Sequence, residues 1–383
     1  MNVEFTGLRP QGERLRTQIL SRIETALTHG KFIMGPEVHE LEKQLAAFCG
    51  AKHAIAVANG TDALQIALMC AGVQPGDHVL VPSFTYTATA EVILVLGASP
   101  IFVDVGPDTF NLDCEDLECT IKAHDPAKGP LKAIIGVDLF GMPAHWAALK
   151  AIAERHGLFL VADAAQSFGA RSADGAVGTL AHVTTASFFP AKPLGCYGDG
   201  GAIFTDDDGL ANTMRSIRVH GQGAQKYETV RVGVNSRLDT IQAAVLLAKL
   251  EVFEEELANR NALAEAYDRQ LHALVDTPPL PADAGVRSAW AQYTIKVDHR
   301  DAFKAALAAA GVPSAVYYPL PMHLQPAYLR YGGGAGSLPV SEALSERVIS
   351  LPMNPYWTNE DLEAVCGGVR AALDETSQWK QAS

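Results

Sequence analysis

The segment LFLVADAAQSFG, residues 158–169, is an apolar run that ends abruptly in an aspartate. The apolar residues from Leu158 to Ala162 are typical of a strand that is buried on both faces of a sheet. Asp163 follows directly, so its carboxylate would stand at the carboxyl end of that strand. Such a carboxylate costs free energy unless it meets a cation or several donors. A turn aspartate or a metal ligand is the alternative, but no second carboxylate or histidine lies at ligand spacing. A buried cation is therefore the better partner.

Similar runs recur along the first two thirds of the chain. We expect further strands at 54–58, 78–81, 100–105, 133–139, 186–189 and 201–204, with helices at 62–71, 88–96, 114–123 and 144–156. Apolar strands separated by helices indicate a mostly parallel sheet that helices cover on both faces. In such a sheet, ligands bind at the carboxyl ends of the strands.

The last third of the chain has a different pattern. A long helix is expected from about residue 239 to 274, followed by Pro278, Pro279 and Pro281. Beyond these prolines, strands near 293–297 and 314–318 and helices near 300–310, 341–349 and 359–372 form a smaller α+β unit. We therefore predict a large domain of residues 1–255 and a small domain of residues 256–383.

Composition excludes several classes of protein. The formal charge of −13 argues against a nucleic-acid or anionic-membrane surface, although a pocket for a small charged ligand remains compatible. No stretch has the order of a signal peptide or the length of a membrane span. The six cysteines show no C-x-x-C pair and no spacing with histidine that suggests a metal site, so we expect reduced thiols and a cytoplasmic protein without a bound metal.

Lys192 lies within SFFPAKPLGCYGDGG, residues 187–201. A proline lies close to it on each side, and a glycine-rich turn follows. An amine held on a stiff turn can form a Schiff base with a carbonyl. Most lysines are simply exposed, so this motif alone is weak.

Other polar groups follow other predicted strands. The tetrad Asn59-Gly60-Thr61-Asp62 opens a helix after the strand at 54–58, where main-chain N–H groups and the helix dipole favour an anion. A plain helix cap is the alternative. Tyr86 follows the strand at 78–81, and Ser187 ends the strand before Lys192. Judged alone, Tyr86 is more often a core residue than a cofactor platform.

One small molecule needs all of these groups. Pyridoxal phosphate carries an aldehyde for a lysine, a phosphate for a helix N-terminus, and a ring nitrogen that pairs with a carboxylate. Its chemistry therefore accounts for Lys192, Thr61 and Asp163 together.

These motifs, with VNSRLD at residues 234–239, resemble the DegT/StrS family of nucleotide-sugar aminotransferases over essentially the whole chain. The resemblance implies a fold type I aminotransferase, with pyridoxal phosphate bound to Lys192 and its ring nitrogen paired with Asp163. It further implies a set of cofactor contacts: Gln166 near the ring hydroxyl, Tyr86 stacked on the ring, Gly60, Thr61 and Ser187 on the phosphate, and Asn235 reaching that phosphate from the other subunit of a homodimer.

The resemblance also suggests a substrate. Within the family, the chain is most similar to enzymes that install the 3-amino group on a UDP-linked 2-acetamido-3-keto hexuronic acid, with L-glutamate leaving as 2-oxoglutarate, for bacterial surface polysaccharides such as lipopolysaccharide O-antigen. The implied substrate contacts are Arg237, Tyr317, Tyr318, His323 and Met34, for each of which core, loop or interface packing is an alternative. Two positions depart from relatives: Asp138 stands where many relatives have histidine or serine, and Tyr317 stands where some close relatives have histidine.

Four alternatives stay open or are disfavoured. A 4-aminotransferase acting on a 4-keto-6-deoxy nucleotide sugar would share every cofactor residue. A sugar dehydratase of the same family would carry histidine in place of Lys192. A non-catalytic regulator that binds the cofactor would be expected to have an appended basic segment, which is absent. A nicotinamide dehydrogenase would need a G-x-G-x-x-G motif after the first strand, and the glycines after Lys192 follow the wrong element.

Overall fold

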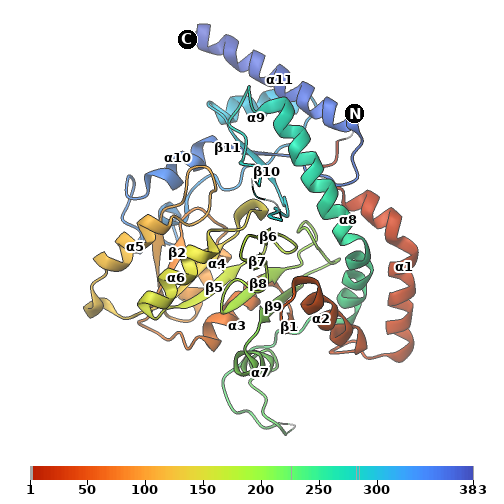
Figure 1. Cartoon of the computed structure of the whole chain (residues 1–383), viewed down its shortest axis with the longest axis vertical. Helices are drawn as coiled ribbons and strands as arrows, with labels where there is room; N and C mark the ends of the chain where they lie inside the picture. Colours follow the sequence, from red (N-terminus) through yellow and green to blue (C-terminus); the bar gives the residue numbers. More distant parts are fainter. Residues whose placement is uncertain (1–2, 226, 282, 284, 383) are drawn as a thin grey trace.

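The computed structural model describes residues 3–225, 227–281, 283 and 285–382, and its centre is a seven-stranded sheet with the order β1-β9-β8-β5-β4-β2-β3 (Figure 1). The strands are β1 (His53–Val57), β2 (His78–Pro82), β3 (Ser99–Val103), β4 (Leu131–Val137), β5 (Phe159–Asp163), β8 (Val183–Ser187) and β9 (Gly201–Thr205). Only β9 runs opposite to its neighbours β1 and β8. The predicted mostly parallel sheet is confirmed, and the carboxyl ends of β1, β2, β5 and β8 share one edge.

Helices cover both faces of this sheet because successive strand residues point to opposite sides. In β1, Ala54 and Ala56 join one buried cluster, whereas Ile55 and Val57 join the other. The first cluster lies under α2 (Pro36–Cys49), α5 (Cys114–Ala123), α6 (Trp146–His156) and part of α8 (Thr240–Leu271). The second lies under α3 (Gly60–Cys70), α4 (Ala88–Val95) and α7 (Asp208–Ile217).

The long helix α8 connects the sheet to the C-terminal unit (Figure 1). Its first half packs on the sheet and on α1 (Leu8–His29), and its last turns join a separate core through Ala264, Tyr267 and Leu271. That core also contains β10 (Tyr293–Lys296), β11 (Val348–Leu351), α9 (Arg300–Ala309) and α11 (Asn359–Ala382). The domain boundary near residue 255 falls inside α8 and stays a prediction. Residues 1–2 and 383, at the ends of the two predicted domains, lie outside the described residues.

Two predicted elements of the C-terminal unit were wrong. The expected helix at 341–349 is α10 (Pro339–Arg347), and it stops before β11 because Val348 to Leu351 pair with β10 and are fully buried. The expected strand at 314–318 is reduced to one bridge between Ala315 and Ser350. The remaining short elements are the strands β6 (Arg171–Ser172) and β7 (Gly175–Ala176) and three 3-10 turns, η1 (Pro126–Lys128), η2 (Leu139–Gly141) and η3 (Met322–Leu324).

Candidate active site

The carboxyl edge of the sheet holds the predicted catalytic pair. Asp163 is the last residue of β5, and Ser187 is the last residue of the neighbouring strand β8. Parallel pairing places Asp163 beside Thr185, two residues before Ser187. Strand geometry therefore brings the carboxylate close to the start of the segment that carries Lys192.

The segment between β8 and β9 is a tight turn that holds Lys192 in place. The N–H of Lys192 donates to the carbonyl of Phe189 (2.9 Å), and the N–H of Cys196 donates to the carbonyl of Phe188 (2.8 Å). Gly195 is required by close approach, since a Cβ there would lie 2.5 Å from the carbonyl oxygen of Pro190. The glycine-rich pattern thus serves to fold the turn back on itself.

Asp163 and Lys192 perturb one another in a desolvated site. The Asp163 side chain is 6% exposed and accepts hydrogen bonds from Thr89 Oγ1 (2.9 Å) and the N–H of Ala165 (3.1 Å). Burial raises the pKa of Asp163, while these donors and the charge of Lys192 oppose the rise. Burial lowers the pKa of Lys192, and Asp163 opposes that decrease. A lysine in this environment has a larger neutral fraction than an exposed one, which nucleophilic and proton-transfer roles require.

The N-terminus of α3 adjoins the end of β8. The Asn59 side chain caps the helix by accepting from the N–H of Asp62 (2.7 Å). The predicted cap and the predicted anion site are compatible, because the N–H groups of Gly60 and Thr61, in the first turn, have no intrahelical acceptor. A Cβ at Gly60 would lie 2.7 Å from Ser187 Cβ, so glycine allows helix and strand to meet.

An aromatic wall is formed by Tyr86 and Tyr318, whose ring centroids lie 6.3 Å apart. Tyr86 is 57% exposed, so one face of its ring is free for stacking. Gln166 donates from Nε2 to Tyr318 Oη (3.1 Å) and accepts from the N–H of Phe140 (2.6 Å). Gln166 therefore lies between the Asp163 turn and the aromatic wall.

Three predicted site residues lie outside helices and strands, namely Asn235, Arg237 and Met34. Asn235 is exposed, and its neighbour Ser236 is tied to the end of β1 by a hydrogen bond from the N–H of Ala58 (3.1 Å). Arg237 is partly buried on the same segment. Met34 is partly buried with φ of 51°, packs against the core, and follows a residue, Ile33, that bridges to Asp239.

His323 lies elsewhere than expected for a substrate contact. Its side chain is fully buried, with Nδ1 2.7 Å from Ser83 Oγ and Nε2 3.1 Å from Glu342 Oε1. Both ring nitrogens are thus occupied within the chain, and this arrangement gives no support to direct contact with a substrate. Tyr317 packs beside Tyr318, with ring centroids 6.0 Å apart.

Two residues at the site were not assigned from the sequence. Thr89 sits in the first turn of α4, and nothing in its local pattern distinguishes it from a packing residue. Asp138, the departure from many relatives, is 1% exposed and accepts from the N–H of Ala144 (2.7 Å), Ser167 Oγ (2.7 Å) and Trp146 Nε1 (2.9 Å). Asp138 therefore orders the loop after β4 and the turn that follows Asp163.

The arrangement fits pyridoxal phosphate. The buried carboxylate of Asp163 can pair with a protonated ring nitrogen, Lys192 can bind the aldehyde, and the Gly60–Ser187 contact forms a cradle for the phosphate. Among the described residues, no cluster of three or more histidine, cysteine or acidic side chains could hold a metal ion.

The chain is similar to a known family of aminotransferases. The sequence model of the DegT/DnrJ/EryC1/StrS aminotransferase family matches residues 13–370. The UDP-2-acetamido-2-deoxy-3-oxo-D-glucuronate aminotransferase of Pseudomonas aeruginosa is 48% identical over 368 residues, which cover 96% of this chain and 99% of the relative.

Solved structures lead to the same family. A DegT DnrJ EryC1 StrS aminotransferase from Brucella abortus is 50% identical, with a TM-score of 0.92 over 96% of this chain and 98% of that one. NtdA from Bacillus subtilis, solved with the bound cofactor PMP, is 30% identical, with a TM-score of 0.88 over 97% of this chain and 85% of that one. The chain therefore belongs to the DegT/DnrJ/EryC1/StrS aminotransferase family and is a pyridoxal-phosphate-dependent aminotransferase.

Proposed function

We propose that this chain transfers the amino group of L-glutamate to C3 of a UDP-linked 2-acetamido-3-keto hexuronic acid. The substrate assignment rests on the 48% identity, over nearly the full length of both chains, to the Pseudomonas aeruginosa aminotransferase named for that 3-oxo-glucuronate. The retained Lys192, which feels the charge of the buried Asp163 carboxylate, supports an aminotransferase rather than a dehydratase or a regulator.

The roles of the chain's own groups follow from their placement. When bound, the cofactor supplies an electron sink that stabilises negative charge on the carbon that bears the amine. Asp163 keeps the ring nitrogen protonated, because a buried carboxylate strongly favours a neighbouring positive charge. Lys192 Nζ would take the proton from the donor carbon and later return a proton to the sugar carbon. Its lowered pKa favours the neutral amine that the first step needs.

Binding groups surround this pair. We assign the phosphate to the N–H groups of Gly60 and Thr61 and to the Ser187 hydroxyl, the cofactor ring to the face of Tyr86, and the ring hydroxyl to Gln166. The Gln166 NH2 group has two N–H donors, so it can bond the cofactor while it also donates to Tyr318 Oη, 3.1 Å away.

A homodimer with shared active sites is part of the proposal. Asn235 is exposed and bridges to Val219 at the base of the segment that projects after α7 (Figure 1), and we propose that it reaches a second subunit. Large apolar side chains are also exposed near the site, including Phe189 at 52% and Ile33 at 50%. Arg237, two residues after Asn235, is the proposed guanidinium for a carboxylate of the donor or of the sugar.

We further propose that the enzyme works in the cytoplasm and supplies an amino sugar for bacterial surface polysaccharide such as O-antigen. All six cysteines are free thiols, as expected in a reducing compartment. No described helix combines the length and the apolar character that crossing a membrane requires.

A reverse-direction panel tests the substrate. The purified enzyme is incubated with 2-oxoglutarate and with UDP-linked 3-amino uronates, 4-amino sugars or 3-amino sugars that lack the carboxylate, and glutamate is measured. We expect glutamate from the 3-amino uronates. Turnover of the 4-amino sugars alone would assign the chain to the 4-aminotransferases, and no turnover with any sugar would contradict the proposal.

A further inference from the structure

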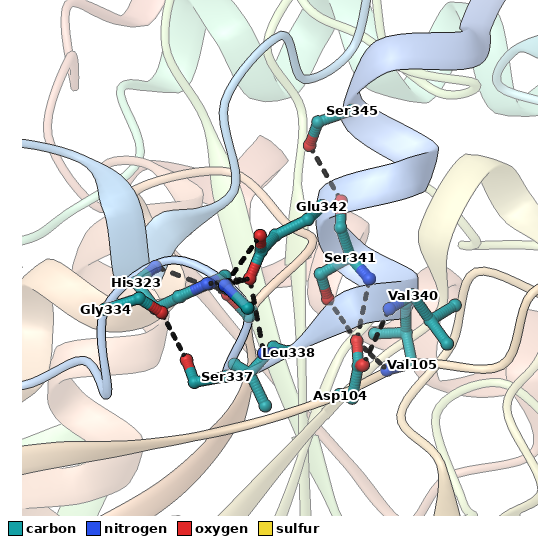
Figure 2. A network of polar contacts seen from close by, with 12 residues as sticks. Asp104, Val105, His323, Gly334, Ser337, Leu338, Val340, Ser341, Glu342 and Ser345 are labelled. Carbon is teal, nitrogen blue, oxygen red and sulfur yellow. Dashed lines mark hydrogen bonds and ion pairs between the residues drawn. The ribbon is translucent and has the colours of Figure 1, made fainter.

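A relay of three side chains, Ser83, His323 and Glu342, connects the end of β2 to helix α10 of the C-terminal unit. His323 contacts Ser83 through Nδ1 (2.7 Å) and Glu342 through Nε2 (3.1 Å), and the second contact is visible in Figure 2. The main-chain N–H of His323 also donates to Ser83 Oγ (3.3 Å). Ser83 and His323 are both fully buried, whereas the Glu342 side chain is 23% exposed, so the relay reaches the surface only at its Glu342 end.

Ser83 connects this relay to the active-site edge. It follows β2 directly, three residues before Tyr86, and its carbonyl accepts from the N–H of Met322 (2.8 Å). The segment from Tyr317 to His323 is therefore fixed to the end of β2 by main-chain and side-chain bonds. Phe84, the next residue, packs edge-to-face on Tyr318 with ring centroids 6.0 Å apart.

Glu342 holds the other end of the relay. Its carboxylate also accepts from the N–H groups of Gly336 (2.8 Å) and Leu338 (3.3 Å), and with the contact to His323 these bonds lower its pKa. Asp104, just after β3, accepts from the N–H of Ser341 (2.8 Å), so the first turn of α10 is anchored to the sheet (Figure 2).

The Glu342 carboxylate determines which ring nitrogen of His323 donates to it. An ionised carboxylate only accepts hydrogen bonds, so Nε2 of His323 carries a proton and donates to Glu342. In the neutral ring, Nδ1 then accepts from the Ser83 hydroxyl, whose oxygen still accepts the N–H of His323. Every polar group of the relay is satisfied in this arrangement, which makes it rigid and costly to break.

We propose that Glu342, His323 and Ser83 are positioning residues that hold Tyr317 and Tyr318 in place for the nucleotide sugar. This inference rests on the proposed aminotransferase function. None of the three bonds a residue assigned to the cofactor, such as Lys192. Tyr318 also contacts Gln166 and Tyr86, which are assigned to the cofactor. Breaking the relay should therefore impair the sugar half-reaction far more than the glutamate half-reaction or cofactor binding.

The test compares holoenzymes carrying Glu342→Gln and Ser83→Ala with a matched control, Glu346→Gln. Glu346 lies one turn further along α10, is exposed, and loses the same charge. We expect the KM for the UDP-3-keto uronate to rise about tenfold in Glu342→Gln, the scale of one lost hydrogen bond to a charged group, and by a smaller factor in Ser83→Ala, where the lost bond joins neutral groups. The rate at which glutamate bleaches the lysine-bound cofactor should fall far less, and Glu346→Gln should match the unaltered enzyme in both assays.

Hydrogen–deuterium exchange supplies a readout that does not depend on activity. Amides of residues 315–325 should exchange faster in Glu342→Gln and Ser83→Ala, with residues 187–201 unchanged. Equal losses in both half-reactions together with cofactor loss, or exchange identical to the unaltered enzyme, would overturn the proposal. If the substrate assignment is wrong, the unaltered enzyme itself fails to aminate this sugar, while the exchange result still decides the relay.

Discussion

Thr89 is the most informative position for testing how Asp163 is held. Thr89→Val keeps the shape of the side chain and removes the hydroxyl that donates to Asp163 Oδ2 over 2.9 Å. A hydrogen bond to a charged group contributes about 1.5–3 kcal/mol. The loss falls on the state in which Asp163 is ionised and paired with the protonated cofactor ring. Cofactor affinity should therefore fall by about 10- to 100-fold, since about 1.4 kcal/mol corresponds to tenfold.

The assay is titration of the apoenzyme with pyridoxal phosphate, followed by absorbance, at several pH values. Because the lost donor raises the pKa of Asp163, the deficit should be largest at low pH and shrink as pH rises. Thr184→Val is the matched control, since Thr184 is a buried threonine on β8 whose hydroxyl has no partner among the described residues. Equal affinity in Thr89→Val and the unaltered enzyme, or equal losses in both variants, would refute the reasoning.

Three further predictions concern other residues. Burial raises the pKa of Asp138 to about 7. Between about pH 4 and 7 the folded state therefore binds a proton that the unfolded state lacks, and the protein loses stability as pH rises. The unfolding temperature of Asp138→Asn should rise relative to that of the unaltered enzyme from pH 5 to 8, and a pH-independent difference would contradict this. Burial lowers the pKa of Lys249 to about 8, so the folded state carries the full cost of burying the charged amine below pH 8 and regains stability towards pH 10. Lys249→Met should therefore raise the unfolding temperature at pH 7, with a smaller gain at pH 10. No gain at pH 7 would mean that the contact with the Tyr197 ring, 4.3 Å away, offsets this cost entirely. Mixed dimers of Lys192→Ala and Asn235→Ala subunits should regain activity that neither variant has alone, because one of the two sites is then intact; no recovery would place Asn235 in its own subunit's site.

Residues that end a strand were predictable because local pattern and sheet geometry act together. An apolar run marked β5, and the polar residue after it had to lie at the same edge as Ser187 once the strands were parallel. The glycines around Lys192 and the cap before Gly60 were visible for the same reason, since each reflects a local backbone requirement.

Contacts between distant segments were not predictable in this way. Thr89 lies inside a helix and meets Asp163 only after α4 packs on the sheet. His323 was expected to face a ligand, but its partners Ser83 and Glu342 are set by the docking of α10, which no local pattern specifies. The boundary between α10 and β11 was missed because pairing with β10, a non-local contact, overrides helical periodicity.

The central claim, that Lys192 carries the cofactor, can be tested by borohydride reduction of the purified holoenzyme followed by peptide mass spectrometry. Borohydride fixes a Schiff base as a stable secondary amine on the lysine that formed it. We predict a pyridoxyl-phosphate adduct on the peptide that contains Lys192, and none on Lys249, the fully buried lysine beside the same turn. An adduct at Lys249 or at any other lysine, with Lys192 unmodified, would contradict the account.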